Sequence, residues 1–249
     1  MVVLDLVFLT ADLHLNHENI IKEEFGPHRR TQFSSIREMN DTIIRNWKNK
    51  ISDSDTVYVL GDFALGNPEG AVELISNLPG KKYLLMGNHD VPKIQKGKKC
   101  VTAPIDLEHF KYPMDLFEEV YPESKKVELE YDKYTFVMNH FPPNISPETT
   151  FPKHHIYLHA HSHSPQTYNM ANMALHIPVY DVGVDANGFS PISVDELYER
   201  MLLWTKKDQV KCDACGALMK VRYSSYGSFL GCSNYPSCGR KYTPIKIDW

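Results

Sequence analysis

The sequence predicts an α/β protein of stacked layers followed by a small metal-binding segment. Apolar runs of strand length alternate with stretches of helical periodicity along most of the chain. Aspartate, asparagine and histidine follow directly after those runs, which is where α/β folds carry their chemistry. Four of the five cysteines lie after residue 210. This clustering suits a metal site better than a disulfide framework.

Length and composition bound the class of protein. At 249 residues with 42% hydrophobic residues, the chain can bury one large core and carry one small appendage. The apolar run from Val2 to Leu9 contains Asp5 and has no basic residue before it, so we expect a first strand and not a signal peptide. No apolar run reaches the roughly 18 residues that a membrane helix needs. We expect a cytoplasmic protein without a membrane partner.

The formal net charge of −4 is unevenly distributed. The residues from Lys206 onward carry +5, and the preceding part carries −9. This shift in composition predicts two domains, 1–205 and 206–249, with different partners.

The expected elements follow one another in a β-helix-β order. Strands are predicted at residues 4–9, 56–60, 83–86, 156–163 and 179–184, and a hairpin at 127–130 and 134–138. Capping boxes at Ser35/Glu38 and Ser193/Glu196 open helices that end near residues 50 and 206, and a third helix spans 69–78. Residues 91–122 contain four closely spaced lysines and several prolines, and we expect a loop-rich cover over the site with one short helix at 115–120.

Three histidines occupy alternate positions along the strand predicted at residues 156–163. His159, His161 and His163 would project from one side of an extended backbone, because side chains on a strand alternate between its faces. Such a side can bind a metal ion.

The ends of the other strands supply further ligands. The collected side chains are those of Asp12, His14, Asp62, Asn88, His89, His140, His161 and His163. Carboxylates, imidazoles and an amide oxygen suffice for two divalent ions with one carboxylate between them. Two such ions, roughly 3.5–4 Å apart, clamp the attacking and leaving oxygens of a phosphate ester. The sequence therefore predicts phosphoester hydrolysis.

The order of these motifs resembles a known family. Asp-x-His, Gly-Asp, Gly-Asn-His-Asp, a lone His and a final His-x-His are similar to the calcineurin-like metallophosphoesterases, above all small phage and bacterial members, over residues 5–190. The resemblance implies a four-layer α/β/β/α sandwich. It implies one ion held by Asp12, His14, Asp62 and His163, and a second held by Asp62, Asn88, His140 and His161. Mn²⁺ is the expected metal, with Fe, Zn, Ni and Mg as alternatives.

The resemblance also implies catalytic roles. His89 would protonate the leaving group, and Asp90 would orient its imidazole. Protein phosphatases of this superfamily follow Gly-Asp with a second Asp and an arginine that grips the phosphate. Here Asp62 is followed by Phe63-Ala64-Leu65-Gly66, which disfavours a phosphoprotein substrate. Ala160 stands where the last motif usually has Gly. His17 and His159 either line the pocket or hold the ligands in place.

The cysteines form a second metal motif. Cys212 and Cys215 are separated by sixteen residues from Cys232, and Cys238 completes the set. Paired thiolates at this spacing arrange four ligands tetrahedrally around one structural Zn²⁺. Residues 227–238 resemble the C-terminal zinc ribbons of bacterial topoisomerase I, which bind single-stranded DNA. Aromatic and basic residues interleave here as in strand-binding surfaces, namely Tyr223, Tyr226, Phe229 and Tyr235 with Lys220, Arg222, Arg240 and Lys241.

Two functions fit these features. The first is a two-metal phosphodiesterase or nuclease acting on nucleic acid, with the ribbon recruiting single strands. The second is a phosphoesterase for a small linear or cyclic nucleotide, with a ribbon that serves assembly alone as a structural or protein-docking module. A non-catalytic nucleic-acid-binding protein is disfavoured by the full ligand set. The sequence leaves the substrate and the oligomeric state open.

Overall fold

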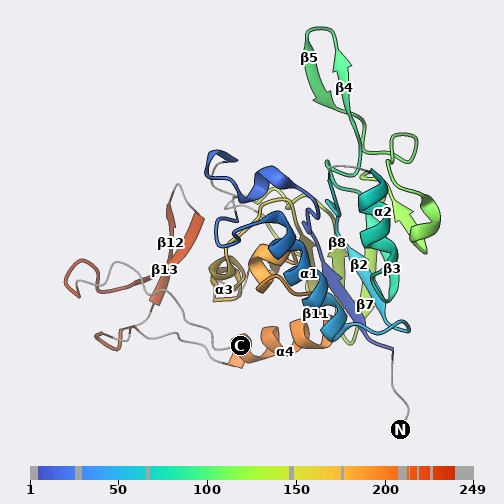
Figure 1. The fold of residues 1–249 in the computed structure, drawn as a ribbon. Coiled ribbons are helices and arrows are strands. Elements are labelled where there is room, and N and C mark those ends of the chain that lie inside the picture. The colour runs from blue at the N-terminus through green and yellow to red at the C-terminus, as the bar shows by residue number, and fades with distance from the viewer. Residues whose placement is uncertain are drawn as a thin grey trace.

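Two β-sheets packed face to face form the centre of the protein (Figure 1). The computed structural model describes residues 5–25, 30–65, 68–145, 149–174, 177–206, 212, 214–217, 219–224 and 227–238. Within these ranges no helix is both long and apolar enough to cross a membrane.

The first sheet has five strands in the order β11-β1-β2-β3-β6. They are β1 (Val7–Thr10), β2 (Thr56–Val59), β3 (Lys81–Leu85), β6 (Glu119–Tyr121) and β11 (Ile192–Ser193). All pair in parallel except β11, which runs antiparallel to β1. Parallel strands bring their carboxyl ends to one edge of the sheet, so the residues that follow them meet there.

The second sheet has four strands in the order β10-β9-β8-β7. They are β7 (Val127–Tyr131), β8 (Tyr134–Met138), β9 (His155–His159) and β10 (Val179–Asp181). Strands β8, β9 and β10 are parallel, and β7 pairs antiparallel with β8 through the predicted hairpin.

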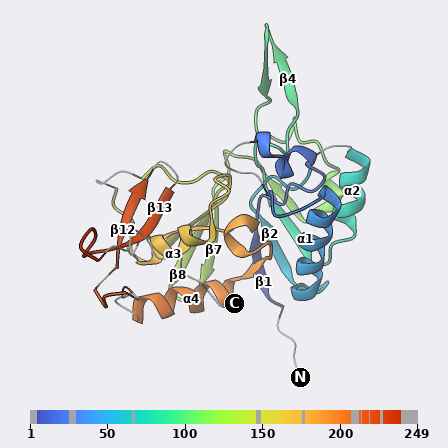
Figure 2. The same cartoon turned by 60° about the vertical axis from the view of Figure 1, so that its left-hand side comes forward.

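Alternating side chains build two separate cores. On β1, Phe8 joins the core under the first helices, and Leu9 joins the core between the sheets. The helices are α1 (Ile36–Lys50), α2 (Pro68–Ser76), α3 (Gln166–Ala174) and α4 (Val194–Lys206), and four short 3₁₀ turns span Glu18–Ile21, Glu23–Phe25, Met114–Leu116 and Val184–Asn187. Figure 2 shows α1 and α2 outside the first sheet and α3 outside the second. The predicted α/β/β/α order is confirmed.

Local signals placed the helix starts correctly. The Ser35 hydroxyl accepts a hydrogen bond from the backbone N–H of Glu38 at 3.1 Å, and the Ser193 hydroxyl accepts one from the backbone N–H of Glu196 at 3.0 Å. Each such cap is worth about 1 kcal/mol of helix stability. At the other end of α1, the indole of the buried Trp47 donates to the carbonyl of Pro79 at 2.9 Å, which ties the helix to the turn before β3.

The interpretation of residues 91–122 was wrong in part. Strands β4 (Lys93–Lys96) and β5 (Lys99–Thr102) form a separate hairpin instead of a loop-rich cover. The short helix expected at 115–120 is only a 3₁₀ turn, and its last residues belong to β6. Val120 is buried in the sheet beside Leu84 of β3, and this long-range pairing prevails over the local preference.

The cysteine segment contains a β-hairpin. Strands β12 (Met219–Ser224) and β13 (Gly227–Cys232) pair antiparallel, and β13 contacts α3. Helix α4 ends at Lys206, beside the expected domain boundary.

Candidate metal centre

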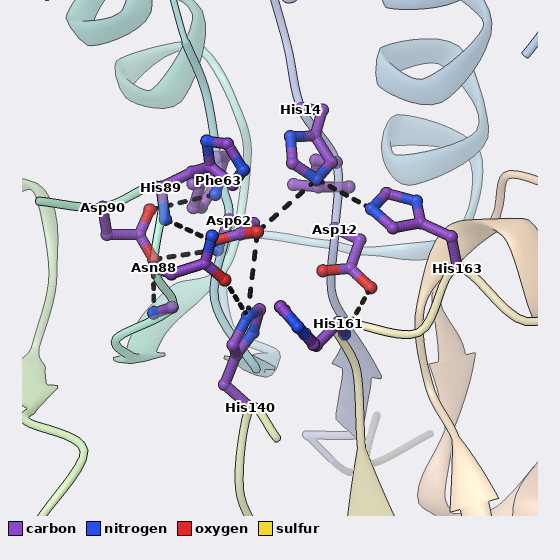
Figure 3. Close-up of polar contacts among 12 residues, drawn as sticks. Asp12, His14, Asp62, Phe63, Asn88, His89, Asp90, His140, His161 and His163 are labelled. Atoms are coloured by element: carbon purple, nitrogen blue, oxygen red, sulfur yellow. Dashed lines mark hydrogen bonds and ion pairs between the residues drawn. The ribbon is translucent and has the colours of Figure 1, made fainter. Parts of the chain in front are cut away.

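The residues of the predicted site converge at one edge of the two sheets (Figure 3). The candidate ligand atoms form two groups, and within each group all atoms lie within 4.8 Å of one another. One comprises Asp12, His14 and His163, and the other comprises Asp62, His140 and His161.

The Asp62 carboxylate lies between the two groups of candidate ligand atoms. Its Oδ2 lies 3.5 Å from His14 Nε2 on one side and 3.7 Å from His140 Nε2 on the other. His14 Nε2 is also 3.1 Å from His163 Nε2, and His140 Nε2 is 3.2 Å from Asn88 Oδ1. One carboxylate therefore joins two ligand groups.

The backbone at the site is unusual. Asp12, His14, Asp62, His161 and His163 all have positive φ, between 45° and 65°. Such conformations cost roughly 1–3 kcal/mol each in non-glycine residues and collect at functional sites. Here these conformations turn the chain sharply after the strands, so that the aspartate and histidine side chains point toward one another.

The ligand loops also need two glycines. A Cβ on Gly87 would lie 2.3 Å from Asp62 Oδ1, and a Cβ on Gly61 would lie 2.5 Å from His140 Nδ1. Only a residue without a side chain permits the β2 and β3 loops to approach this closely.

The three-histidine strand was predicted incorrectly. Strand β9 ends at His159, and His161 and His163 lie in the turn that follows. His159 is fully buried away from the cluster, with its Nδ1 2.9 Å from the Ala160 carbonyl and its Nε2 3.1 Å from the Tyr168 hydroxyl of α3. It is a packing residue. His17, in contrast, places its ring 5.4 Å from that of His14 and 6.0 Å from that of His89, on the rim of the site.

The donor set fits divalent cations. Among the described residues, Asp12 Oδ1 and His14 Nδ1 are buried without a hydrogen-bond partner. Burial raises the pKa of Asp12 well above its usual range and raises that of Asp62 to about 6, while burial lowers the pKa of His14. A cation at the cluster would stabilise the ionised forms of Asp12 and Asp62 and would give the buried Asp12 Oδ1 the partner that it lacks.

Two of the candidate ligand histidines are held in a defined tautomer. His140 Nδ1 donates to the Leu60 carbonyl at 2.7 Å, and His163 Nδ1 donates to Asp185 Oδ2 at 2.8 Å. Each contact leaves Nε2 as the lone-pair atom that faces the cluster.

Behind His163 lies a buried ion pair that the sequence did not reveal. Arg30, only 1% exposed, donates to both oxygens of Asp185 at 2.9 and 2.7 Å. The same guanidinium donates to the carbonyls of Asp12 and Leu13 at 2.6 and 3.0 Å. Arg30 thus ties the first ligand loop to the residue that orients His163. No local motif marks it, because its partner lies 155 residues away in the sequence.

Asp90 has a different role from the one expected. Its carboxylate accepts the backbone N–H groups of Asp62, Phe63 and Gly87 at 2.8, 3.1 and 2.8 Å. Among the described residues no hydrogen bond joins it to His89. Asp90 therefore fixes the backbone of two ligand loops and does not orient the imidazole.

His89 stands beside the bridging carboxylate. Its backbone N–H donates to Asp62 Oδ1 at 2.8 Å, and its ring lies 5.1 Å from that of His14. Burial, together with the charges of His17 and Lys111, lowers its pKa to about 4. The side chain is neutral at pH 7 in the free protein, and a bound phosphate anion would raise its pKa.

Two further residues near the site were not predicted. Lys111 donates to the Ala64 carbonyl at 3.2 Å, and its charge acts on Asp62, His17 and His89. The buried Tyr112 hydroxyl donates to the same carbonyl. They lie in the segment expected to be a cover, where no motif marked them.

The four cysteines form the second candidate metal site. Their sulfurs lie within 4.8 Å of one another, with 3.7 Å between Cys212 and Cys238 and 3.5 Å between Cys215 and Cys232. Tetrahedral Zn²⁺ with Zn–S bonds near 2.3 Å requires sulfurs about 3.8 Å apart. Cys100 is exposed on β5, outside this group.

Most of the surface predicted to bind single-stranded nucleic acid on this segment lies outside the residues that the structure describes. Tyr226, Arg240 and Lys241 lie outside the described residues, and only the backbone of Lys220, Arg222, Tyr223 and Phe229 is described. Tyr235 is exposed at the tip of the second cysteine loop.

Comparisons with known proteins agree with this architecture. Residues 6–165 match the calcineurin-like phosphoesterase family, and residues 209–245 match the topoisomerase DNA-binding C4 zinc finger. The chain is 30% identical to an uncharacterized protein of Methanocaldococcus jannaschii, over 76% of this chain and 87% of that one. It is also 30% identical to the gene 66 protein of Mycobacterium phage L5, over 77% and 92% of the two chains.

A solved structure shares the fold. A protein of unknown function from Aquifex aeolicus superposes with a TM-score of 0.54 at 23% identity, covering 79% of this chain and 100% of that one. The match over residues 6–165 shows that the chain belongs to the calcineurin-like phosphoesterase family, metal-dependent hydrolases with a binuclear centre, and the match over residues 209–245 shows that it carries a C-terminal topoisomerase-type C4 zinc ribbon.

Proposed function

We propose that this enzyme is a phosphodiesterase or nuclease that acts on nucleic acid, and that its zinc ribbon recruits single strands. The observation that carries the proposal is the union, in one chain, of a two-metal phosphoesterase site with a ribbon of the DNA-binding topoisomerase type. A boundary near residues 205 and 206 would separate an acidic catalytic domain from a basic binding domain.

The proposed ligand sets follow the two groups of side chains. Asp12, His14 and His163 would hold one ion, and Asn88, His140 and His161 the other, with Asp62 shared between them. When bound, two divalent cations would supply Lewis-acid stabilisation of the charge on the phosphate oxygens. The mixture of carboxylate, imidazole and amide ligands favours Mn²⁺.

The proposed proton donor is His89. Its backbone is anchored to Asp62, so its imidazole stays at the rim of the cluster, where a leaving oxygen would depart. A phosphate anion beside the ring would favour the imidazolium that can donate this proton. Lys111 supplies positive charge on the same side of the site.

The residues after Asp62 support a substrate other than a phosphoprotein. Phe63, which follows the bridging Asp62, is fully buried, and its ring packs 6.1 Å from Trp47 and 5.9 Å from Phe117. The run after Asp62, residues 63–66, supplies neither the second Asp nor the arginine that the protein phosphatases carry after this motif. The small-nucleotide function remains the second candidate, because it needs the same metals.

Point variants in the full-length protein test the ribbon's role. Tyr226→Ala and Phe229→Ala should each weaken binding of a labelled single-stranded oligonucleotide by roughly 1–3 kcal/mol, because each removes a ring on which a base can stack. Tyr226→Phe and Phe229→Tyr are the matched controls, since they retain the ring. Anisotropy measures binding, and zinc content shows that the ribbon is intact.

The same variants should hydrolyse bis(p-nitrophenyl) phosphate at the wild-type rate. Unchanged oligonucleotide affinity in both alanine variants would contradict recruitment by the ribbon. Activity on small nucleotides without any cleavage of oligonucleotides would favour the second candidate.

A further inference from the structure

The β4–β5 hairpin takes part in neither central sheet. It leaves the body of the protein as a two-stranded ribbon (Figures 1 and 2). Its strands pair from Lys93 opposite Thr102 to Lys96 opposite Lys99, and at its base the Ala103 amide donates to the Pro92 carbonyl at 3.0 Å. The hairpin begins three residues after Asp90. It therefore grows directly out of the loop that carries the candidate ligand Asn88 and the candidate proton donor His89.

The charge of this hairpin is one-sided. Lys93, Lys96, Lys98 and Lys99 are exposed, and residues 91–105 include no acidic residue. No ion pair to any of the four appears among the described residues. Lys96 and Lys99 face each other directly across the strands. Like charges in such pairs are unfavourable, so the hairpin concentrates positive charge without a counter-charge of its own.

The hairpin is not held by packing. All of its strand residues are exposed except Val101, which is half-buried. At the tip, Gly97 has a φ of +63°, a conformation that favours glycine, and a Cβ there would contact nothing within 4 Å. An isolated two-stranded hairpin is only marginally stable in water. An external polyanion would neutralise the lysines and stabilise it.

The length of the hairpin indicates what kind of anion it suits. Lys96 lies three residue steps beyond Lys93 on β4, so the tip lysines lie roughly 10 Å beyond Lys93. One strand of a duplex presents one phosphate per roughly 3.4 Å of helix axis, so this reach corresponds to about three nucleotides measured along the axis. The hairpin also contains no aromatic residue on which a base could stack. The hairpin is therefore suited to binding the phosphates of a nucleic-acid strand whatever its base sequence.

We propose that the β4–β5 hairpin is a backbone-binding arm that holds the phosphates of a nucleic-acid strand leading into the metal centre. This inference rests on the proposed function and deepens it, because it assigns the enzyme a polymeric substrate. The competing explanation is that the lysines only prevent an exposed edge from pairing with other chains.

Two charge-matched variants separate these explanations. The hairpin variant replaces Lys96, Lys98 and Lys99 with Gln and leaves Lys93, nearest the site, unchanged. The control variant replaces Lys48, Lys81 and Lys133 with Gln. These three lysines are exposed at the end of α1, the start of β3 and the β7–β8 turn, which all lie at the opposite edge of the sheets. Both variants change the net charge equally.

Oligonucleotide affinity, measured against salt concentration, is the first readout. If all three tip lysines contact phosphates of a single strand, the slope of log K against log salt should flatten by about 2, and affinity near 0.1 M salt should fall about 100-fold. The control variant should keep the wild-type slope, and both variants should turn over bis(p-nitrophenyl) phosphate like the wild type. Equal slopes in all three proteins would overturn the proposal.

Substrate length and the exposed Cys100 provide a second readout. The hairpin variant should lose activity on a twelve-nucleotide strand and retain it on a dinucleotide, which is too short to reach the tip. In the wild type, the long strand should slow maleimide labelling of Cys100, and the dinucleotide should not. If the wild type cleaves oligonucleotides but neither effect is seen, the arm is refuted and the proposed function stands. If the wild type cleaves no oligonucleotide, both are refuted.

Discussion

Replacing Asp185 with asparagine should weaken both the fold and the metal centre. In the native protein, burial raises the pKa of Asp185, but Arg30 and His163 outweigh it and hold the pKa well below its usual range. The variant leaves the guanidinium of Arg30, which is 1% exposed, without its counter-charge. Breaking a buried pair in this way costs about 3–5 kcal/mol. That is about a third of the stability of a typical domain.

The metal effect has a separate cause. The amide that replaces the carboxylate is a weaker acceptor for His163 Nδ1, so the imidazole loses the charge-assisted hydrogen bond that orients its Nε2. Loss of such a contact lowers metal affinity about 10- to 100-fold. We expect Mn²⁺ titration by calorimetry to show this decrease, and urea unfolding in chelator to show the loss of stability without metal.

A double-mutant cycle isolates the ion pair. Arg30→Met alone should also destabilise the protein, because the carbonyls of Asp12 and Leu13 lose their donor. Arg30→Met combined with Asp185→Asn should cost less than the sum of the two single changes, with a coupling energy of about 1–3 kcal/mol. Strictly additive losses, or an Asp185→Asn protein as stable as the wild type in chelator, would refute the role assigned to this pair.

Three further predictions concern single residues. Asp62→Asn should abolish nearly all turnover of bis(p-nitrophenyl) phosphate, because the bridge contacts both ligand groups; undiminished turnover would contradict a two-metal site. His89→Asn should slow alkyl esters far more than p-nitrophenyl esters, whose leaving group needs no proton, with metal content unchanged; equal losses would indicate a positioning role. Burial raises the pKa of Asp55, but hydrogen bonds from Ser52 and Leu6 have the larger, opposite effect, so the folded pKa lies below its usual value. The ionised carboxylate therefore stabilises the protein above the unfolded pKa near 3.9, and this stabilisation is lost as the pH falls through the lower folded pKa. Asp55→Asn should therefore destabilise the protein at pH 7 and much less at pH 2.5 in urea unfolding; an equal difference at both pH values would argue against this.

Local and periodic signals were sufficient for much of this protein. The helix starts at Ser35 and Ser193 were predicted correctly, because a capping hydroxyl and its amide lie three residues apart in the chain. Strand and helix periodicities indicated a layered α/β fold, and the family resemblance supplied the order of its four layers. Each candidate ligand was recognised because it follows directly after a strand, and parallel strands bring such positions to one edge.

Tertiary structure decided the remaining features. The strand period of two suggested that three histidines share a face, but positive φ at His161 and His163 ends that period after His159. Asp90 was assigned to its sequence neighbour His89, and folding placed it instead against backbone amides from another loop. Arg30 had no signal at all, because its partner is distant in sequence. Motif spacing identified the candidate ligands. Contacts between distant segments, which exist only once the chain has folded, decided which of these residues face the cluster, which position others and which pack, and added residues such as Arg30 that no motif marks.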